Sequence, residues 1–302
     1  MSSTRVSIGF VVAAGVLFGT AGTAQALGPA DTTPFGVGIL RIQVGALALL
    51  LSMPFLGLHP RRILQLWRTW PNLVTALGAA VYQVVFFAAV LQTGVALGTL
   101  VTVGSEPMLA GLLGWIVLRH RPTLGWAAAT VIAVTGLALT SWGSLEGGTV
   151  LGLLFALAAG LSSACFVVGA KIQLDRGVTA IEITTASFTL GGLLLLPLLL
   201  VQPLAWVAQP SGIALVLYLG VATMAIANVL HTRGIHGLKP GPVATLMLTD
   251  PLVATLLGVI VLGEAPAPVA LAGVGLILVG LLLQGLVLAR EEPDREEPAP
   301  IL

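Results

Sequence analysis

Three charged residues lie inside long apolar stretches of this sequence, where a charge is costly and therefore informative. Arg41, Glu106 and Asp250 each have runs of mostly aliphatic and small residues around them. A charge at the centre of a bilayer costs about 2.5–3.5 kcal/mol on insertion scales, so such residues usually serve a function or form a pair. A carboxyl group in this setting can bind an ammonium group or a proton.

Each of the two acids directly precedes a proline, Pro107 or Pro251, which we expect to act as a backbone hinge. Proline lacks an N–H group, so it frees the carbonyl four residues earlier, which here belongs to Val103 or Met247. Each acid lies about eight residues into its predicted helix, or roughly 12 Å from one membrane surface. A carboxyl beside a freed carbonyl could hold a cation, so both acids are predicted to bind substrate or couple its transport.

Structural roles for the three charged residues remain open as alternatives. Arg41 is expected at about the same depth as Glu106, so the two could form a structural ion pair. The position equivalent to Arg41 in the second half of the chain is Thr185. Asp250 therefore has no such partner, and its alternatives are a neutral, protonated acid or a contact with His231.

Other candidate binding residues are the polar and aromatic side chains expected at a similar depth. They are Tyr82, Gln83, Phe86, Ser162, Ser163, Phe166, Met224, Asn228 and His231. Aromatic and amphipathic groups suit a cavity for partly apolar solutes, although such residues also commonly pack or face lipid. Gly15 and Gly19 are predicted to support the backbone of the site, with close helix packing as the alternative role.

The composition indicates that these residues belong to a membrane protein. Hydrophobic residues make up 57% of the 302 positions and charged residues 8%, whereas a soluble domain carries about 25% charged residues. A membrane-crossing helix needs roughly 20 apolar residues. Ten runs of this kind are present, and none alternates as a barrel strand would. The predicted spans of this all-α membrane protein are 6–26, 35–56, 72–92, 98–118, 123–141, 150–170, 180–200, 211–231, 242–262 and 267–288.

The ends of the spans carry recognisable signals. Thr179 and Glu182 form a T-x-x-E capping box at the start of the seventh span. Four tryptophans near span ends are typical of interfacial anchors, namely Trp67, Trp70, Trp142 and Trp206. The first run ends in Ala24-Gln25-Ala26, which resembles a signal-peptide cleavage site, but it is longer than a usual signal sequence, so we expect it to be retained.

Basic residues predict the orientation of the spans. Lys and Arg concentrate in cytoplasmic loops. With the N-terminus inside, every Lys and Arg except Arg41 falls on the inner side of the predicted spans. Ten spans therefore place both termini in the cytoplasm, followed by a charged, Pro-rich segment, 290–302, which we expect to be disordered.

The two halves of the chain align when the sequence is shifted by 144 residues. The segment from Pro107 to Pro122 matches the segment from Pro251 to Pro266 at nine of sixteen positions. Five spans per half is an odd number, so the second half must cross the membrane in the opposite sense. The predicted repeats are 1–145 and 146–289, and inverted repeats of this kind are common in secondary transporters.

These features resemble the EamA branch of the drug/metabolite transporter superfamily. The resemblance rests on two five-helix halves, Arg41 in the second span, a proline in the fourth and ninth spans, and Gly263-Glu264 with Pro266. It implies a prokaryotic inner-membrane protein that exports amino acids, including apolar or aromatic ones, or other metabolites. Alternating access would then operate by facilitated diffusion or by exchange with protons. At the position of Gly263-Glu264, the first half departs from the pattern with Arg119-His120.

Several classes are excluded or disfavoured by the sequence. No phosphate-binding loop and no H-E-x-x-H motif occurs, and the net charge of +1 gives no basic field for nucleic acid. The single Cys165 cannot form an intramolecular disulfide, and no metal or cofactor is expected. A small-molecule substrate and the lipid bilayer are the expected partners, and the oligomeric state is undefined. A membrane-embedded lipid-modifying enzyme and a non-transporting sensor remain the alternatives.

Overall fold

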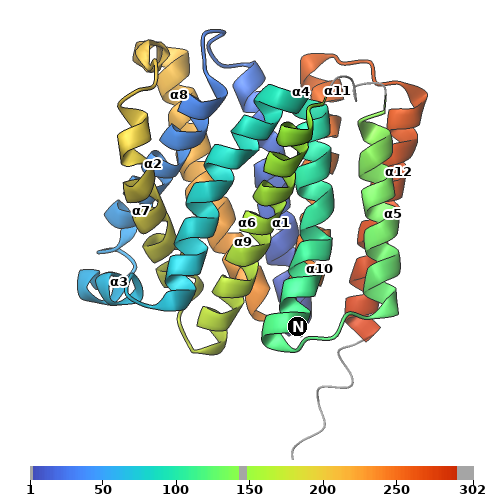
Figure 1. The fold of residues 1–302 in the computed structure, drawn as a ribbon, viewed down its shortest axis with the longest axis horizontal. Helices are drawn as coiled ribbons and strands as arrows, with labels where there is room; N and C mark the ends of the chain where they lie inside the picture. The colour runs from blue at the N-terminus through green and yellow to red at the C-terminus, as the bar shows by residue number, and fades with distance from the viewer. Residues whose placement is uncertain (1–2, 143–147, 291–302) are drawn as a thin grey trace, which may run out of the picture.

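All regular elements in the described part of the chain, residues 3–142 and 148–290 of a computed structural model, are helical (Figure 1). The elements are α1 (Ser3–Ala26), α2 (Pro34–Ser52), α3 (Pro60–Leu66), α4 (Trp70–Leu118), α5 (Leu124–Thr140), α6 (Val150–Asp175), α7 (Ala180–Leu199), η1 (Ala205–Ala208), α8 (Pro210–Tyr218), η2 (Leu219–Ile226), α9 (Ala227–His236), α10 (Pro240–Leu246), α11 (Thr249–Leu262) and α12 (Pro268–Arg290). The predicted all-α class is confirmed for these residues. The repeat boundary after residue 145 and the tail beyond Arg290 lie outside them.

The helices have the length and surface of an integral membrane protein. In the described ranges, eight helical stretches are long and apolar enough to cross a bilayer, and α5 is a shorter apolar helix of 17 residues. Many large aliphatic side chains point outward, including Leu124, Ile260 and Leu282 at 91%, 75% and 68% exposure. Lipid is the solvent that accepts such a surface.

Helix α4 consists of two helical segments that meet at Gly94. Its 49 residues would extend about 74 Å if straight, more than twice the hydrocarbon thickness of a bilayer. Gly94 has φ 77° and ψ 164°, a backbone conformation that residues other than glycine rarely adopt. Figure 1 shows the chain turning back there, so that the segments 70–93 and 95–118 run in opposite directions. The third and fourth predicted spans correspond to these segments.

Two of the predicted spans are irregular. The eighth contains a π-helical stretch, η2, between α8 and α9, which the sequence did not indicate. The ninth, in which a hinge was expected at Pro251, breaks between α10 and α11 at residues 247–248. At the break, the N–H of Asp250 donates to the Met247 carbonyl at 2.9 Å. The Met247 carbonyl, predicted to be free, is therefore satisfied by a short turn.

Threonine side chains start several of the helices. Thr33, Thr123, Thr149 and Thr179 each accept a hydrogen bond from the first turn that follows them. The predicted capping box of Thr179 and Glu182 is confirmed, and Glu182 also pairs with Arg62.

Trp206 does not face the membrane surface as an interfacial anchor would. It is 1% exposed and packs against Val37 and Leu215. The prediction of an anchor was wrong here because the short helix η1 folds inward against α2 and α8.

Glycines allow some helices to pack at backbone contact. Helices α5 and α12 form a pair at one side of the molecule (Figure 1). A Cβ at Gly136 would lie 2.6 Å from the Gly273 carbonyl, and one at Gly280 would lie 2.9 Å from the Ala129 carbonyl. The two contacts are related by the repeat. Gly136 and Gly280 are 144 positions apart, as are Ala129 and Gly273, so each helix plays the same part once.

The same shift relates two helix ends. Arg119 after α4 and Gly263 after α11 both adopt left-handed backbone conformations, with φ 60° and φ 69°. Each donates its N–H to a carbonyl five residues earlier, that of Gly114 or Gly258. The positions at which the halves differ in sequence therefore keep the same backbone geometry.

Replacing Gly280 with alanine tests the contact between α5 and α12. The added methyl group would meet Ala133 at 2.6 Å, and overpacking of this kind costs about 1–3 kcal/mol. We expect a lower melting temperature in detergent for Gly280→Ala. Gly285→Ala on the same helix is the control, because nothing lies within 4 Å of its added Cβ. Equal melting temperatures for the two variants would contradict the contact.

Candidate functional site

A polar cluster forms where α2, the two segments of α4, and α11 approach each other. Arg41 of α2 donates from Nε and Nη2 to Oε1 of Gln83 at 3.2 and 3.1 Å. Tyr82 and Asp250 lie close enough to interact electrostatically with the guanidinium. The guanidinium carbon also lies 5.9 Å from the centre of the Phe87 ring. Arg41 is therefore held by an amide, an aromatic ring and a distant acid.

The two acids belong to the same cluster. Glu106, in the second segment of α4, lies within hydrogen-bonding reach of Ser163 on α6 and interacts electrostatically with Asp250. Asp250 lies in the first turn of α11, where the helix dipole favours a carboxylate. The fold thus brings together two acids that are 144 residues apart in the sequence.

The ionisable side chains of the cluster are enclosed but not fully buried. Arg41, Tyr82, Glu106 and Asp250 are surrounded by protein, yet each keeps part of its surface accessible.

The expected ion pair between Arg41 and Glu106 is not formed. In the described residues, the ion pairs are Arg62–Glu182 and Lys171–Asp175. Gln83 accepts the hydrogen bonds of the guanidinium, and Glu106 instead lies within reach of Ser163. Asp250, rather than Glu106, is the acid that acts on Arg41.

An aromatic group extends from the cluster along α4. Tyr82 and Phe86 stack with ring centres 5.4 Å apart, and Phe86 meets Phe87 edge-on at 5.3 Å. The predicted shared face of Tyr82 and Phe86 is confirmed. Phe87 was missed, although its position four residues after Gln83 places it on the same helix face.

A second aromatic group joins α6, α7 and α9. His231 stacks on Phe166 with ring centres 6.4 Å apart, and Phe166 contacts Phe188 at 6.0 Å. Nε2 of His231 is buried without a hydrogen-bond partner. The alternative contact between Asp250 and His231 is not among the hydrogen bonds or ion pairs of the described residues.

Three candidate binding residues make contacts within the protein. The Ser162 hydroxyl donates to the Ala158 carbonyl in its own helix. Met224 is 4% exposed in the main core cluster. The Asn228 amide donates to the carbonyls of Thr223 and Met224, within and beside the π-helical stretch. Their polar groups or surfaces are therefore engaged by neighbouring protein.

The glycines of α1 bring its backbone against the Asp250 region. A Cβ at Gly15 would lie 2.9 Å from Thr249, and one at Gly19 would lie 2.6 Å from the Asp250 carbonyl. The packing role of these glycines is therefore supported. In the other half, a Cβ at Gly160 of α6 would lie 2.4 Å from the Ser105 hydroxyl, beside Glu106.

Comparisons with known proteins agree with this architecture. A model of the "EamA-like transporter family" matches residues 5–142 and again residues 150–286. The "Uncharacterized transporter YwfM" of Bacillus subtilis (strain 168) is 37% identical over 271 residues, covering 87% of this chain and 88% of that protein. A "Probable terminal-alkyne amino-acid exporter" of Streptantibioticus cattleyicolor is 25% identical, covering 79% of each chain.

Other similarities are more distant. "Protein PecM" of Dickeya dadantii (strain 3937) is 28% identical over 212 residues, covering 69% of this chain and 70% of that protein. One solved crystal structure matches with a TM-score of 0.80 at 20% identity, covering 95% of this chain and 100% of the other. That similarity shows the fold alone.

Replacing Gln83 with leucine tests how Arg41 is held. Hydrogen bonds to charged groups contribute about 1.5–3 kcal/mol, so we expect Gln83→Leu to lower thermal stability in detergent. Gln65→Leu, on the exposed face of α3, is the control. Combining Gln83→Leu with Arg41→Met should cost less than the sum of the single changes, because both remove one interaction. Additive effects would argue against the pair.

Proposed function

Because this chain belongs to the EamA-like transporter family, we propose that it is a secondary transporter that exports small metabolites, with amino acids as the first candidate class. The family and two of the relatives found are named for transport, and none is named as an enzyme, so a lipid-modifying enzyme is not favoured. The chain is an integral membrane protein, and its bacterial relatives indicate the inner membrane.

The cluster of Arg41, Glu106 and Asp250 is the observation that carries the proposal. A zwitterionic amino acid presents an ammonium group and a carboxylate. The two acids would bind the ammonium, and Arg41 would bind the carboxylate through its planar guanidinium. The Tyr82–Phe86 stack would contact an apolar or aromatic side chain of the substrate. The similarity to a protein named as an amino-acid exporter supports the same class.

The charge balance of the cluster favours exchange with protons over simple diffusion. With both acids ionised, two negative charges face one positive charge among largely apolar helices. The excess negative charge is costly inside a membrane, and either a proton or a substrate ammonium would neutralise it. Competition between the two for one site would link export of substrate to import of a proton.

We also propose ten membrane spans arranged as two inverted repeats, 1–145 and 146–289, with both termini in the cytoplasm. The eight long apolar stretches of the described ranges become nine when the two segments of α4 are counted separately, and α5 is the tenth. The two successive matches to the family model support the repeat. So do the paired contacts of α1 with α11 and of α6 with α4. Two related halves of opposite orientation can rock around a shared site and open it to either face.

Neutralising the acids tests the site. We expect Asp250→Asn and Glu106→Gln each to lower amino-acid counterflow in proteoliposomes on the order of tenfold or more, because the excess charge that attracts the ammonium is lost. Asp31→Asn is the control, since Asp31 is exposed outside the cluster. Wild-type counterflow by both variants, at acid and at neutral pH, would refute the role of the acids. Absence of counterflow from the wild type with any amino acid would refute the substrate class.

Cysteine labelling tests the orientation. In a Cys165→Ala background, Arg121→Cys and Ala265→Cys place single thiols at positions that the repeat makes equivalent. We expect an impermeant maleimide added to intact cells to label only the second, because the α4–α5 and α11–α12 connections would lie on opposite sides. Labelling of both from the same side would rule out inverted repeats.

A further inference from the structure

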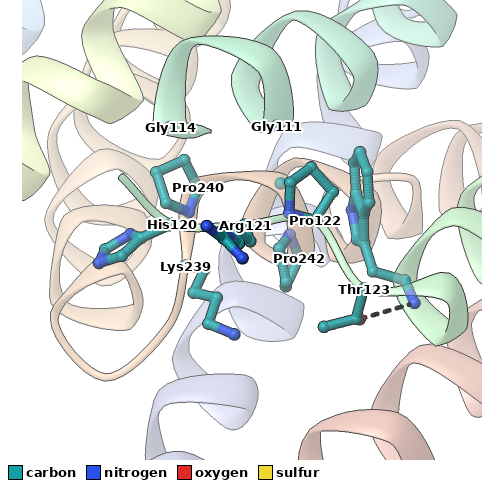
Figure 2. Close-up of a pocket in the computed structure, with 11 residues that line it drawn as sticks. Gly111, Gly114, His120, Arg121, Pro122, Thr123, Lys239, Pro240 and Pro242 are labelled. Carbon is teal, nitrogen blue, oxygen red and sulfur yellow. Dashed lines mark hydrogen bonds between the residues drawn. The ribbon is translucent and has the colours of Figure 1, made fainter. Parts of the chain in front are cut away.

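A pocket lies at the ends of three helices, away from the membrane-embedded cluster (Figure 2). Gly111 and Gly114 near the end of α4 form one wall. Residues 120–123 of the connection to α5, together with Trp126 at the start of α5, form another. Residues 239–242 at the start of α10 complete it.

Close packing gives this pocket a fixed shape. A Cβ at Gly114 would lie 3.2 Å from the Pro240 ring, and one at Gly111 would lie 2.5 Å from the ring of Trp126. Two further prolines, Pro122 and Pro242, line it. The Trp126 ring is itself held, because its Nε1 donates to the Thr245 hydroxyl at 3.2 Å.

The polar side chains of the pocket are mainly cationic. Arg121, Lys239 and the His120 imidazole line it, and no Asp or Glu is among its described lining residues. Figure 2 shows Arg121 and Lys239 beside each other, with the nitrogen-bearing end of Lys239 directed away from the helix that carries Gly111 and Gly114. A small pocket with this composition attracts an anion.

Exposed aliphatic side chains, which suit contact with lipid, lie next to the pocket. Leu124, which begins α5 beside the pocket, is 91% exposed, and Ile116 near the end of α4 is 58% exposed. Basic groups at the ends of membrane helices, next to lipid-facing aliphatic surface, suit a molecule with an anionic head and apolar chains.

We propose that this pocket binds the phosphate headgroup of an anionic phospholipid, with the acyl chains lying along the exposed surface of α4 and α5. The bound headgroup would contact α4 and α5 on one side and α10 on the other. These helices come from different halves of the chain. The lipid therefore stabilises the arrangement in which Gly114 packs against Pro240.

Lipid titration followed by native mass spectrometry tests the proposal on the full-length protein in detergent. We expect phosphatidylglycerol to bind in preference to phosphatidylcholine. Each of Arg121→Gln and Lys239→Gln should weaken phosphatidylglycerol binding roughly fivefold, the contribution expected of one basic side chain at an anionic surface. Arg61→Gln is the control, because Arg61 is an exposed basic residue on α3 outside the pocket.

Three results would overturn the proposal. One is equal phosphatidylglycerol binding by the wild type and both pocket variants. Another is displacement of the lipid by inorganic phosphate at similar concentration, which would indicate a site for a free anion. The third concerns the acidic segment from Glu291 to Glu297. If the lipid binds only after residues 291–302 are deleted, that segment is the natural occupant.

Discussion

A charge among lipid-facing helices must be neutralised by nearby groups, and this requirement shapes the centre of the molecule. Arg41 can stay ionised because Gln83 accepts two of its hydrogen bonds and Asp250 lies within electrostatic range. Glu106 has Ser163. These partners come from α2, α4, α6 and α11, so the relative positions of four helices depend on a few polar contacts. Elsewhere the core is mainly apolar, with smaller hydrogen-bonded groups such as that of Asn72, Thr75 and Ser187.

Glycine contacts provide the second constraint. The backbone of α1 meets that of α11 at Gly15 and Gly19, and α6 meets α4 at Gly160. Larger side chains would separate these helices and move the acids apart. Because corresponding contacts recur in the two halves, the cluster lies where the proposed repeats meet. A site formed jointly by two halves changes shape whenever the halves move, which is the property that a transporter needs.

Most of the fold could be predicted from the sequence because membrane helices are long and their apolar runs are continuous. The helices, the capping box at Thr179 and the pairing of the two acids in the repeat all followed from local patterns. The π-helical stretch did not, because no residue in η2 marks a π-helix. A hinge was expected at Pro251, but the full break of the helix before Thr249 was not, because it depends on tertiary contacts.

The site was predicted in part, for a related reason. Depth in the membrane can be estimated by counting residues, but the direction of a side chain depends on helix rotation, which counting does not give. Arg41, Glu106 and Asp250 were identified by their charge inside apolar stretches, and depth placed them at similar levels. Because of how the helices are rotated about their axes, Ser163 rather than Ser162 lies near Glu106, and Gln83 rather than Glu106 binds Arg41.

The π-helical stretch η2 gives α9 a freedom that an ordinary helix lacks. A π turn contains one residue more than an α turn, so one residue can pass through it while the helix remains hydrogen-bonded. Such a step rotates the segment beyond it by about 100° and advances it by about 1.5 Å. His231, which lies just over one turn after the end of η2, would then change its position relative to the ring of Phe166. A small shift of α9 along its axis is thus coupled to a large rotation of its side chains.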